Sequence, residues 1–263
     1  MSSFLKASNI FDTSFNSDLY FESLSAEYTK TSLLKAINSS NIPIIFLLGE
    51  PGVGKTYMLN ILQKNFSLDK KVFFTSEPFS SPESFLYFLL QDTIFDKRIT
   101  ISELKTEAIN KFKNLNHIII IDEAQLLNNV VLEFIRTLSD TGYFNFLLSM
   151  HKQEGDEIVK RTHFLSRNHR VIVLGILKMN EIKKYIESQL LKHGLGDISS
   201  LFDKKQVNLL LKLSKGNFRI TKQLLKHTFL IMDYAKTNGH FNYVTPNKCV
   251  ITMAGIDLGI INA

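Results

Sequence analysis

The most constraining feature of the chain is one eight-residue stretch, Gly49-Glu50-Pro51-Gly52-Val53-Gly54-Lys55-Thr56. Its glycine spacing and its final Lys-Thr pair are those of a phosphate-binding loop. An apolar run precedes it at residues 42–48, and a helical pattern begins near Lys55, which is the strand–loop–helix context that the motif requires. Glycines let backbone N–H groups curl around phosphate oxygens, and the helix N-terminus adds partial positive charge. The stretch therefore predicts a nucleotide site.

Each polar residue of this loop has an expected task. Lys55 is expected to reach the β- and γ-phosphates, and the Thr56 hydroxyl to hold Mg²⁺. The backbone groups of the loop and of the next residue are expected to line the ATP site, which gives the cofactor-binding set Gly49, Glu50, Pro51, Gly52, Val53, Gly54, Lys55, Thr56 and Tyr57. The alternative, a plain Gly-rich turn between strand and helix, does not explain the Lys-Thr pair.

Length and composition limit the class of protein. A chain of 263 residues with 44% apolar and 21% charged residues has room for two modest domains or one large one. The single cysteine, Cys249, excludes an internal disulfide and a Cys-rich metal site, so Mg²⁺ bound with nucleotide is the one metal expected. The start of the sequence lacks a signal-peptide pattern, and the apolar runs are of strand length. We expect a cytoplasmic protein.

The order of apolar patterns predicts an α/β fold. Strand-like runs alternate with helical patterns over residues 1–175, which favours a parallel sheet covered by helices on both faces, the αβα sandwich of P-loop NTPases. Residues 176–263 show only three- and four-residue spacing and predict a small helical lid domain. The tail, residues 249–263, is apolar without a clear period; it is either a partner-binding segment or the last packed piece of the lid. The expected strands are 42–48, 71–75, 117–121, 143–150 and 170–174; the expected helices are 55–65, 81–91, 102–115, 130–139, 180–193, 203–215 and 217–237.

A second motif supplies acidic groups. Residues 117–121 are an apolar run that ends in Asp122 and Glu123. In a nucleotide enzyme Asp122 is expected to hold Mg²⁺, and Glu123 to orient and polarise the water that attacks the γ-phosphate. Acids at strand ends are common, so the pair is informative only together with the upstream phosphate loop.

Other polar residues are candidates for sensing the γ-phosphate. Ser149 or His151, at the end of the next strand, could do so, or could simply meet solvent. Arg167 or Arg170, before the last strand, could enter a neighbouring subunit's site as a finger, or form a surface salt bridge. Arg219 opens a helix in the lid and could fold onto the phosphates, since an arginine is otherwise disfavoured at a helix start.

Positive charge is concentrated in the second half. Residues 176–263 hold 13 Lys/Arg and 6 Asp/Glu, a net charge of +7, whereas the other 175 residues hold 18 and 19, a net charge of −1. A basic lid could face nucleic acid, acidic lipid or an acidic partner, or be a solvated lysine-rich surface.

Taken together, these stretches resemble an AAA+ ATPase, and more narrowly the ExeA-like (general secretion pathway protein A) group. The similarity covers roughly residues 8–237. Besides the two nucleotide motifs, it depends on residues 11–37, on 121–127 (Ile-Asp-Glu-Ala-Gln-Leu-Leu), on the lid entry at 174–194 with Glu181, and on 214–219 (Ser-Lys-Gly-Asn-Phe-Arg).

The resemblance implies ATP hydrolysis, ATP-dependent self-assembly and a helical lid. It carries over Arg219 as second sensor, Ser149 or His151 as first sensor, and Arg167 or Arg170 as finger, and it implies that the amino-terminal segment contacts adenine. The sequence departs from the group's pattern in two places: Ser149-Met150-His151 replaces Gly-Gln-Pro, and Phe218 replaces a proline.

Three functions compete. The first is an energy-coupling ATPase that powers or regulates a secretion, type IV pilus or DNA-uptake apparatus, recruited to the inner membrane by a protein partner. The second is a DNA-binding AAA+ regulator similar to the transposition ATPases of the TniB and MuB kind, which the basic lid and residues 135–142 favour. The third is a nucleotide switch with little turnover, against which the intact Lys55, Asp122 and Glu123 argue.

Overall fold

The computed structural model describes residues 2–12, 21–39, 41–66, 70–91, 93, 99–165 and 168–262. The chain divides into two compact units. The sheet unit comprises residues 28–50 and 55–174, and the helical unit comprises residues 1–27, 51–54 and 175–263.

The sheet unit contains five parallel strands in the order β2-β3-β4-β1-β5. Their bounds are β1 Ile44–Gly49, β2 Lys71–Thr75, β3 His117–Ile121, β4 Phe146–His151 and β5 His169–Val173. Strand β1 lies between β4 and β5, with Ile44 in register with Phe146 on one side and His169 on the other. Strands β1 and β3 are buried along their whole length, as expected of parallel strands covered on both faces.

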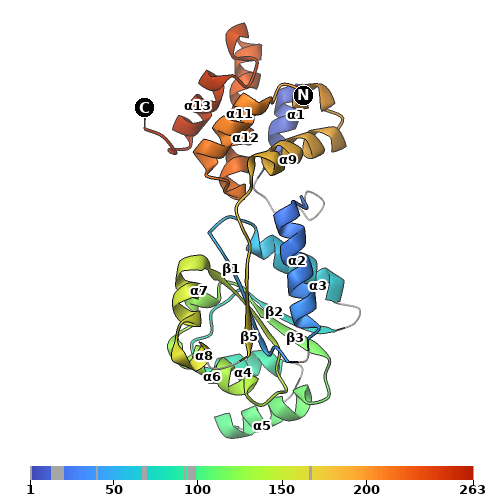
Figure 1. The fold of residues 1–263 in the computed structure, drawn as a ribbon, viewed down its shortest axis with the longest axis vertical. Coiled ribbons are helices and arrows are strands. Elements are labelled where there is room, and N and C mark those ends of the chain that lie inside the picture. The colour runs from blue at the N-terminus through green and yellow to red at the C-terminus, as the bar shows by residue number, and fades with distance from the viewer. Residues whose placement is uncertain are drawn as a thin grey trace. The chain divides into compact units, whose positions relative to one another are not determined.

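Helices cover both faces of this sheet (Figure 1). Alternate residues of β1, such as Phe46 and Leu48, share one core cluster with residues of α4, α5, α6, α7 and α8, while the buried Met58, Leu59 and Leu62 belong to α3. The helices are α2 Leu24–Ile37, which begins in the helical unit, α3 Lys55–Phe66, α4 Pro82–Leu89, α5 Ile101–Phe112, α6 Asn129–Ser139, α7 Lys152–Val159 and α8 Thr162–Leu165. The fold predicted from the sequence, a P-loop αβα sandwich with a helical region after it, is confirmed.

Helix α7 packs closely on the inner strand β1. The ideal Cβ position at Gly155 lies 2.3 Å from Cδ2 of Leu48, which is fully buried. A glycine in a helix interior is unfavourable by about 1 kcal/mol relative to alanine. Here the missing Cβ allows the helix to approach β1.

The helical unit has its own core. Its elements are α1 Ser3–Ile10, α9 Met179–Lys192, α10 Gly196–Ser199, α11 Lys204–Ser214, α12 Phe218–Thr237, the short 3₁₀ helix η3 Phe241–Tyr243, and α13 Lys248–Asp257. Phe11 stacks on Phe229 and meets Tyr185 edge-on, with ring centroids 5.7 Å apart in both pairs. Residues 2–12 therefore pack with the helical unit, whereas the expected boundary assigned all of residues 1–175 to the nucleotide-binding domain.

Several local expectations differ from the structure. The strand expected at 143–150 starts at Phe146 and extends to His151. Helices α1, α2, α7, α8 and α10 had no counterpart among the expected elements. The apolar tail contains α13, whose first turn is capped by Asn247. Among the described residues, no helix has the length and apolarity needed to cross a membrane.

Candidate nucleotide site

The phosphate loop adopts a backbone that requires glycine. Gly52 and Gly54 have φ angles of 81° and 108°, in the region that side chains with a Cβ rarely adopt. At Gly52 a Cβ would also lie 2.7 Å from Oδ1 of Asn217, whereas nothing lies within 4 Å of the Cβ position at Gly54. Backbone conformation alone therefore explains why glycine is needed at position 54. At position 52 both the conformation and the close contact require it.

Lys55 is the first residue of α3 and is only 5% exposed. Its Nζ donates hydrogen bonds to the carbonyl oxygens of Gly49, at 2.9 Å, and Glu50, at 3.4 Å. A buried ammonium group needs acceptors of this kind. These contacts hold the lysine at the loop, where phosphate oxygens would be stronger, charged acceptors.

The two predicted magnesium ligands lie together. Thr56 Oγ1 donates a hydrogen bond of 2.7 Å to Oδ2 of Asp122, and Asp122 is 3% exposed at the end of β3. The backbone N–H of Asp122 donates to the carbonyl of Thr75 at 2.8 Å, which fixes this strand end against β2. A hydroxyl and a carboxylate side by side are the oxygen donors that Mg²⁺ prefers, so the residues present fit this ion.

Glu123 is held by two neighbours. Its Oε2 accepts a hydrogen bond from Nε2 of Gln125 and lies 3.2 Å from Nε2 of His151. The backbone N–H of His151 donates to Oε1 of Gln125 at 3.3 Å, which closes the network. Glu123 itself has a φ of 50°, a left-handed conformation that costs a non-glycine residue about 1–2 kcal/mol and that concentrates at functional sites.

Gln125 is a site residue that the sequence analysis did not single out. It belongs to a 3₁₀ turn, η2 Ala124–Leu126, that begins directly after Glu123. The turn brings the side chain of residue 125 back to the carboxylate of residue 123. Its signals in the sequence were its place two residues after the acidic pair and within residues 121–127, on which the ExeA-like resemblance depends.

The two first-sensor candidates occupy different environments. His151 is partly exposed and contacts Glu123. Ser149 is fully buried, and its Oγ has no hydrogen-bond partner among the residues that the structure describes. The geometry thus brings His151, and not Ser149, to the predicted catalytic carboxylate.

The arginine candidates come from different parts of the chain. Arg167 lies outside the described residues. Arg170 is exposed on β5, at an edge of the sheet. Arg219 is exposed in the first turn of α12, and its backbone N–H donates to the carbonyl of Gly52 at 3.0 Å. Asn217 Nδ2 likewise donates to the carbonyl of Pro51 at 2.6 Å, so both contacts lie within the helical unit, to which residues 51–54 belong.

The remaining cofactor-binding candidates differ in their exposure to solvent. Val53 is buried, Glu50 and Pro51 are exposed, and Tyr57 is half-buried in the first turn of α3. Their contact with nucleotide stays a prediction from the motif.

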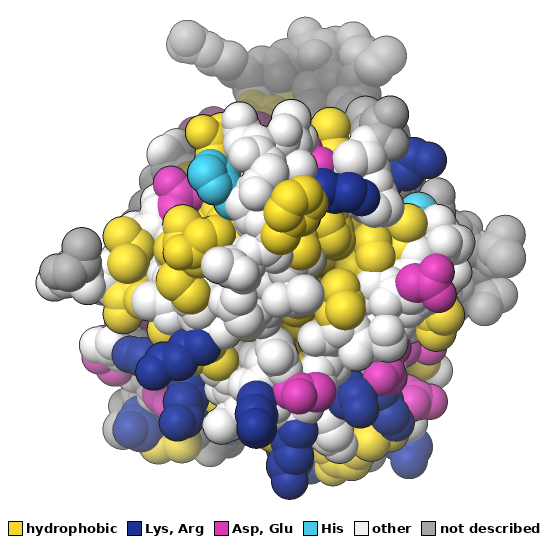
Figure 2. Space-filling view, turned by 90° about the horizontal axis from the view of Figure 1, so that it is seen from above, with side chains coloured by type: hydrophobic (Ala, Val, Ile, Leu, Met, Phe, Trp, Pro, Cys, Tyr) yellow, Lys and Arg dark blue, Asp and Glu magenta, His cyan; other side chains and the backbone are white. Residues whose placement is uncertain are grey.

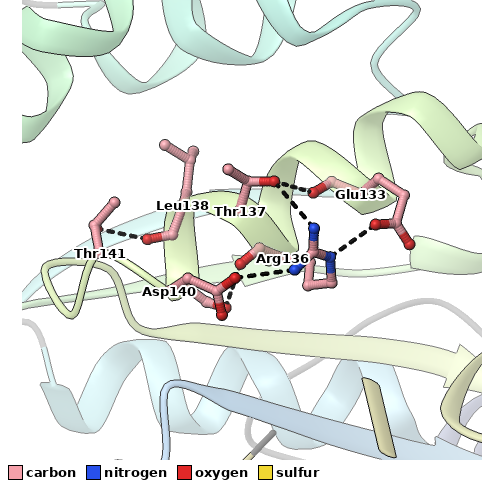
Figure 3. A network of polar contacts seen from close by, with 7 residues as sticks. Glu133, Arg136, Thr137, Leu138, Asp140 and Thr141 are labelled. Atoms are coloured by element: carbon pink, nitrogen blue, oxygen red, sulfur yellow. Dashed lines mark hydrogen bonds and ion pairs between the residues drawn. The ribbon is translucent and has the colours of Figure 1, made fainter. Parts of the chain in front are cut away.

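Arg136, in the segment that favoured a transposition-type regulator, is engaged within its own helix. Its Nε lies 2.7 Å from Glu133 and its Nη1 2.9 Å from Asp140 (Figure 3). The side chain is only 17% exposed. These contacts, at three- and four-residue spacing near the end of α6, stabilise the helix.

Comparison with known proteins agrees with this geometry. Residues 38–158 match the model of a family described as AAA domain. No curated protein sequence matches the chain.

Several solved structures share the fold. Cdc6p from Pyrobaculum aerophilum superposes with a TM-score of 0.60 and 13% identity, over 88% of this chain and 66% of that one. Drosophila ORC bound to DNA gives a TM-score of 0.58 and 15% identity, over 84% of this chain and 66% of that one. The RuvB Holliday junction branch migration motor of Thermotoga maritima gives 0.53 and 17%, over 91% and 72%.

The chain spans about two thirds of the length of the Cdc6p and ORC chains, and at these identities the likeness concerns the fold. The matched segment contains the phosphate loop, the acidic strand end and four of the five strands of the sheet. Residues 38–158, somewhat less than half of the chain, are thus similar to an AAA domain, and the chain shares the fold of these solved structures.

Proposed function

We propose that the chain is a Mg²⁺-dependent ATPase whose nucleotide state controls its binding to DNA. The observation that carries the ATPase assignment is the 2.7 Å contact between Thr56 and Asp122, next to a buried Lys55. Two motifs 66 positions apart in sequence thereby supply one oxygen-donor pair and one cation.

Each residue of the site has a defined task in this proposal. Lys55 neutralises charge on the β- and γ-phosphates, and Thr56 and Asp122 hold Mg²⁺. When bound, Mg²⁺ neutralises the charge that develops on the phosphate oxygens. Glu123 orients a water molecule and accepts its proton, while Gln125 and His151 hold the carboxylate of Glu123.

Two observations support DNA as the partner. The similar structures include ORC described as bound to DNA and a Holliday junction branch migration motor. Residues 176–263 carry a net charge of +7, from 13 basic and 6 acidic residues, and a concentration of positive charge favours binding to a polyanion.

Self-assembly in the presence of ATP is part of the proposal. Arg170 is exposed on edge strand β5, where a cationic side chain can reach a second subunit. With Arg167 it remains our candidate for a finger that completes a neighbouring site, and Arg219 our candidate for a second sensor.

ATP turnover and DNA binding test the proposal together. We expect Mg²⁺-dependent turnover by the unaltered protein, no nucleotide binding by Lys55→Ala, and ATP binding without turnover by Glu123→Gln. Binding to a labelled 30-base-pair duplex should change at least fivefold between the ATP-bound and nucleotide-free forms. Negligible turnover by the unaltered protein would support a nucleotide switch instead, and equal DNA binding in both forms would contradict the coupling.

A secretion, pilus or DNA-uptake role is the second candidate. One contact favours it: Glu181 Oε1 accepts hydrogen bonds of 3.1 Å from both the backbone N–H and the hydroxyl of Ser25. This joins the amino-terminal and lid-entry segments on which the ExeA-like resemblance depends. In this case a protein partner would recruit the ATPase to the inner membrane. Co-purification of the Glu123→Gln form, held with ATP, would show membrane-apparatus proteins rather than DNA.

A further inference from the structure

A basic cleft lies on the helical unit, between the exposed side of α11 and the first turn of α13. Its volume is about 360 Å³. It is lined by Lys205, Gln206, Asn208, Leu209, Lys212, Asn247, Lys248 and Ile251. Residues 205, 208, 209 and 212 fall on one face of α11 because of their three- and four-residue spacing.

The charge of this cleft is positive. Lys205, Lys212 and Lys248 are exposed, and no carboxylate among the described residues forms an ion pair with any of them. An adjoining hollow adds Lys204. Figure 2 shows Lys and Arg side chains gathered over the lower half of the face seen from above. Lysines without acidic partners attract an anionic ligand more strongly than paired ones do.

The lysine side chains, not the helix ends, provide the attraction. The first N–H groups of α11 donate to Asp203, and those of α13 donate to Asn247. Asp203 is also the acidic group of the adjoining hollow. The carboxylate of Asp203 caps the helix, and its negative charge repels an anion in the hollow.

The spacing suits an extended polyanion. Lys205 and Lys212 are seven residues apart on a helix, about 10 Å along its axis, which is too far for one phosphate group. The same length covers about three phosphates of one DNA strand. The floor of the cleft is aliphatic, with Leu209 and Ile251, and can pack against lysine stems.

The lining also favours a duplex over a single strand. None of the residues that line the cleft is aromatic, and non-specific single-strand sites use aromatic rings on which bases stack. The polar groups available, lysine ammonium groups and the exposed Asn208 amide, are the ones that contact phosphates without reading bases.

We propose that the cleft between α11 and α13 binds the phosphate backbone of double-stranded DNA, without sequence preference. This inference rests on the proposed function, because it names the surface that meets DNA. It assigns that contact to residues of the helical unit. Lys55, Thr56, Asp122 and Glu123 take no part in it.

The test is duplex binding by a triple variant, Lys205→Gln, Lys212→Gln and Lys248→Gln, measured by fluorescence anisotropy across a salt series. We expect at least a tenfold loss of affinity at 0.1 M salt, and a salt slope smaller by about 2 to 3 because each lost phosphate contact contributes about 0.9. ATP binding and the circular dichroism spectrum should be unchanged.

A matched variant controls for net charge. Lys6→Gln, Lys183→Gln and Lys192→Gln remove the same charge from helices α1 and α9, and none of these residues lines the cleft. Its DNA affinity should fall less than threefold. Equal losses in the two triple variants would overturn the proposal.

A single substitution tests whether DNA affinity can also be raised at this cleft. Asp203→Asn removes the negative charge beside the cleft and keeps a side chain that caps helices well, so DNA should bind two- to fivefold more tightly. Unchanged or weaker binding would count against the site.

The outcomes separate this inference from the proposed function. If the unaltered protein binds DNA in an ATP-dependent way and the cleft variant binds equally well, the cleft assignment fails and the function stands. If the cleft variant loses binding but ATP has no effect, the cleft stands and the coupling fails. If polyglutamate binds through the cleft and duplex DNA does not, the surface docks an acidic protein and the DNA proposal is wrong.

Discussion

Nε2 of His151 lies 3.2 Å from Oε2 of Glu123, so the end of β4 contacts the second residue after β3. Gln125 binds the same carboxylate oxygen. The proposed catalytic base is thus positioned by two side chains that belong to different segments of the sheet unit.

We expect His151→Ala to lower kcat about tenfold with little change in ATP affinity, because a carboxylate that loses its orientation loses catalytic efficiency. Gln125→Ala should have a similar effect. Since both residues hold one group, the double variant should be less impaired than the product of the single effects. Steady-state turnover and nucleotide binding check this, and full activity of both single variants would contradict it.

The Thr56 hydroxyl can be tested without disturbing packing. Thr56→Val keeps the branched shape but removes the donor to Asp122, so Mg²⁺-dependent turnover should fall by about a hundredfold or more. Thr56→Ser keeps the hydroxyl and should retain most of the activity. A titration of turnover against Mg²⁺ concentration distinguishes the two variants, and similar curves would show that the hydroxyl does not serve the ion.

Gly155→Ala should destabilise the sheet unit. Helix propensity alone favours alanine by about 1 kcal/mol, but the new Cβ would overlap buried Leu48, and overpacking costs about 1–3 kcal/mol. We expect net destabilisation in urea unfolding, with partial rescue when Leu48→Val is added. A gain in stability from the single substitution would mean that α7 can move away from β1.

Lys215→Gly should stabilise the helical unit. Lys215 has a φ of 50° at the end of α11, in the conformation that glycine adopts without the cost of about 1–2 kcal/mol paid by other residues. Lys215→Ala is the control, because it removes the charge but keeps the Cβ. Thermal unfolding should show a higher Tm for the glycine variant only.

Glu181 should make stability depend on pH. Burial raises the pKa of this carboxyl, but hydrogen bonds from the backbone N–H groups of Lys178 and Ser25 and from the Ser25 hydroxyl outweigh it, so its pKa is lowered. A depressed pKa in the folded state gives stability that is present above the unfolded pKa of about 4.3 and is lost as pH falls through the folded value.

Unfolding by urea between pH 7 and pH 3 measures this effect. Glu181→Gln should be less stable than the unaltered protein at pH 7, and the difference should shrink as the pH is lowered. A constant difference over this range would show that the carboxylate charge plays no part.

Much of the sheet unit could be predicted because its signals are local. Residues 118–121 form an uninterrupted apolar run, and such runs between helical patterns are typical of buried parallel strands. The pairing of Thr56 with Asp122 followed from two motifs whose tasks require them to meet. The likeness to AAA+ ATPases was likewise predictable, whereas assignment to the ExeA-like group stays a prediction.

What the sequence did not reveal depends on tertiary contacts. Helix α13 buries one face, with Val250, Ile251, Ala254 and Gly255, but Met253 and Ile256 are exposed apolar residues outside it. Pattern alone therefore did not separate this helix from a coil. Helix α7 contains Gly155, and a glycine stands there because the helix approaches Leu48 closely. The role of Gln125 depends on the turn at 124–126, and such a turn has no periodic signal.

The position of β1 in the sheet has a consequence for synthesis on the ribosome. Its two neighbours, β4 and β5, are the last strands of the sheet to be made. A nascent chain that ends before residue 146 has the complete glycine-rich motif but no strand to pair with the segment that precedes it. ATP capture should therefore arise late in translation, and a truncated product should neither sequester nucleotide nor compete with the full-length protein.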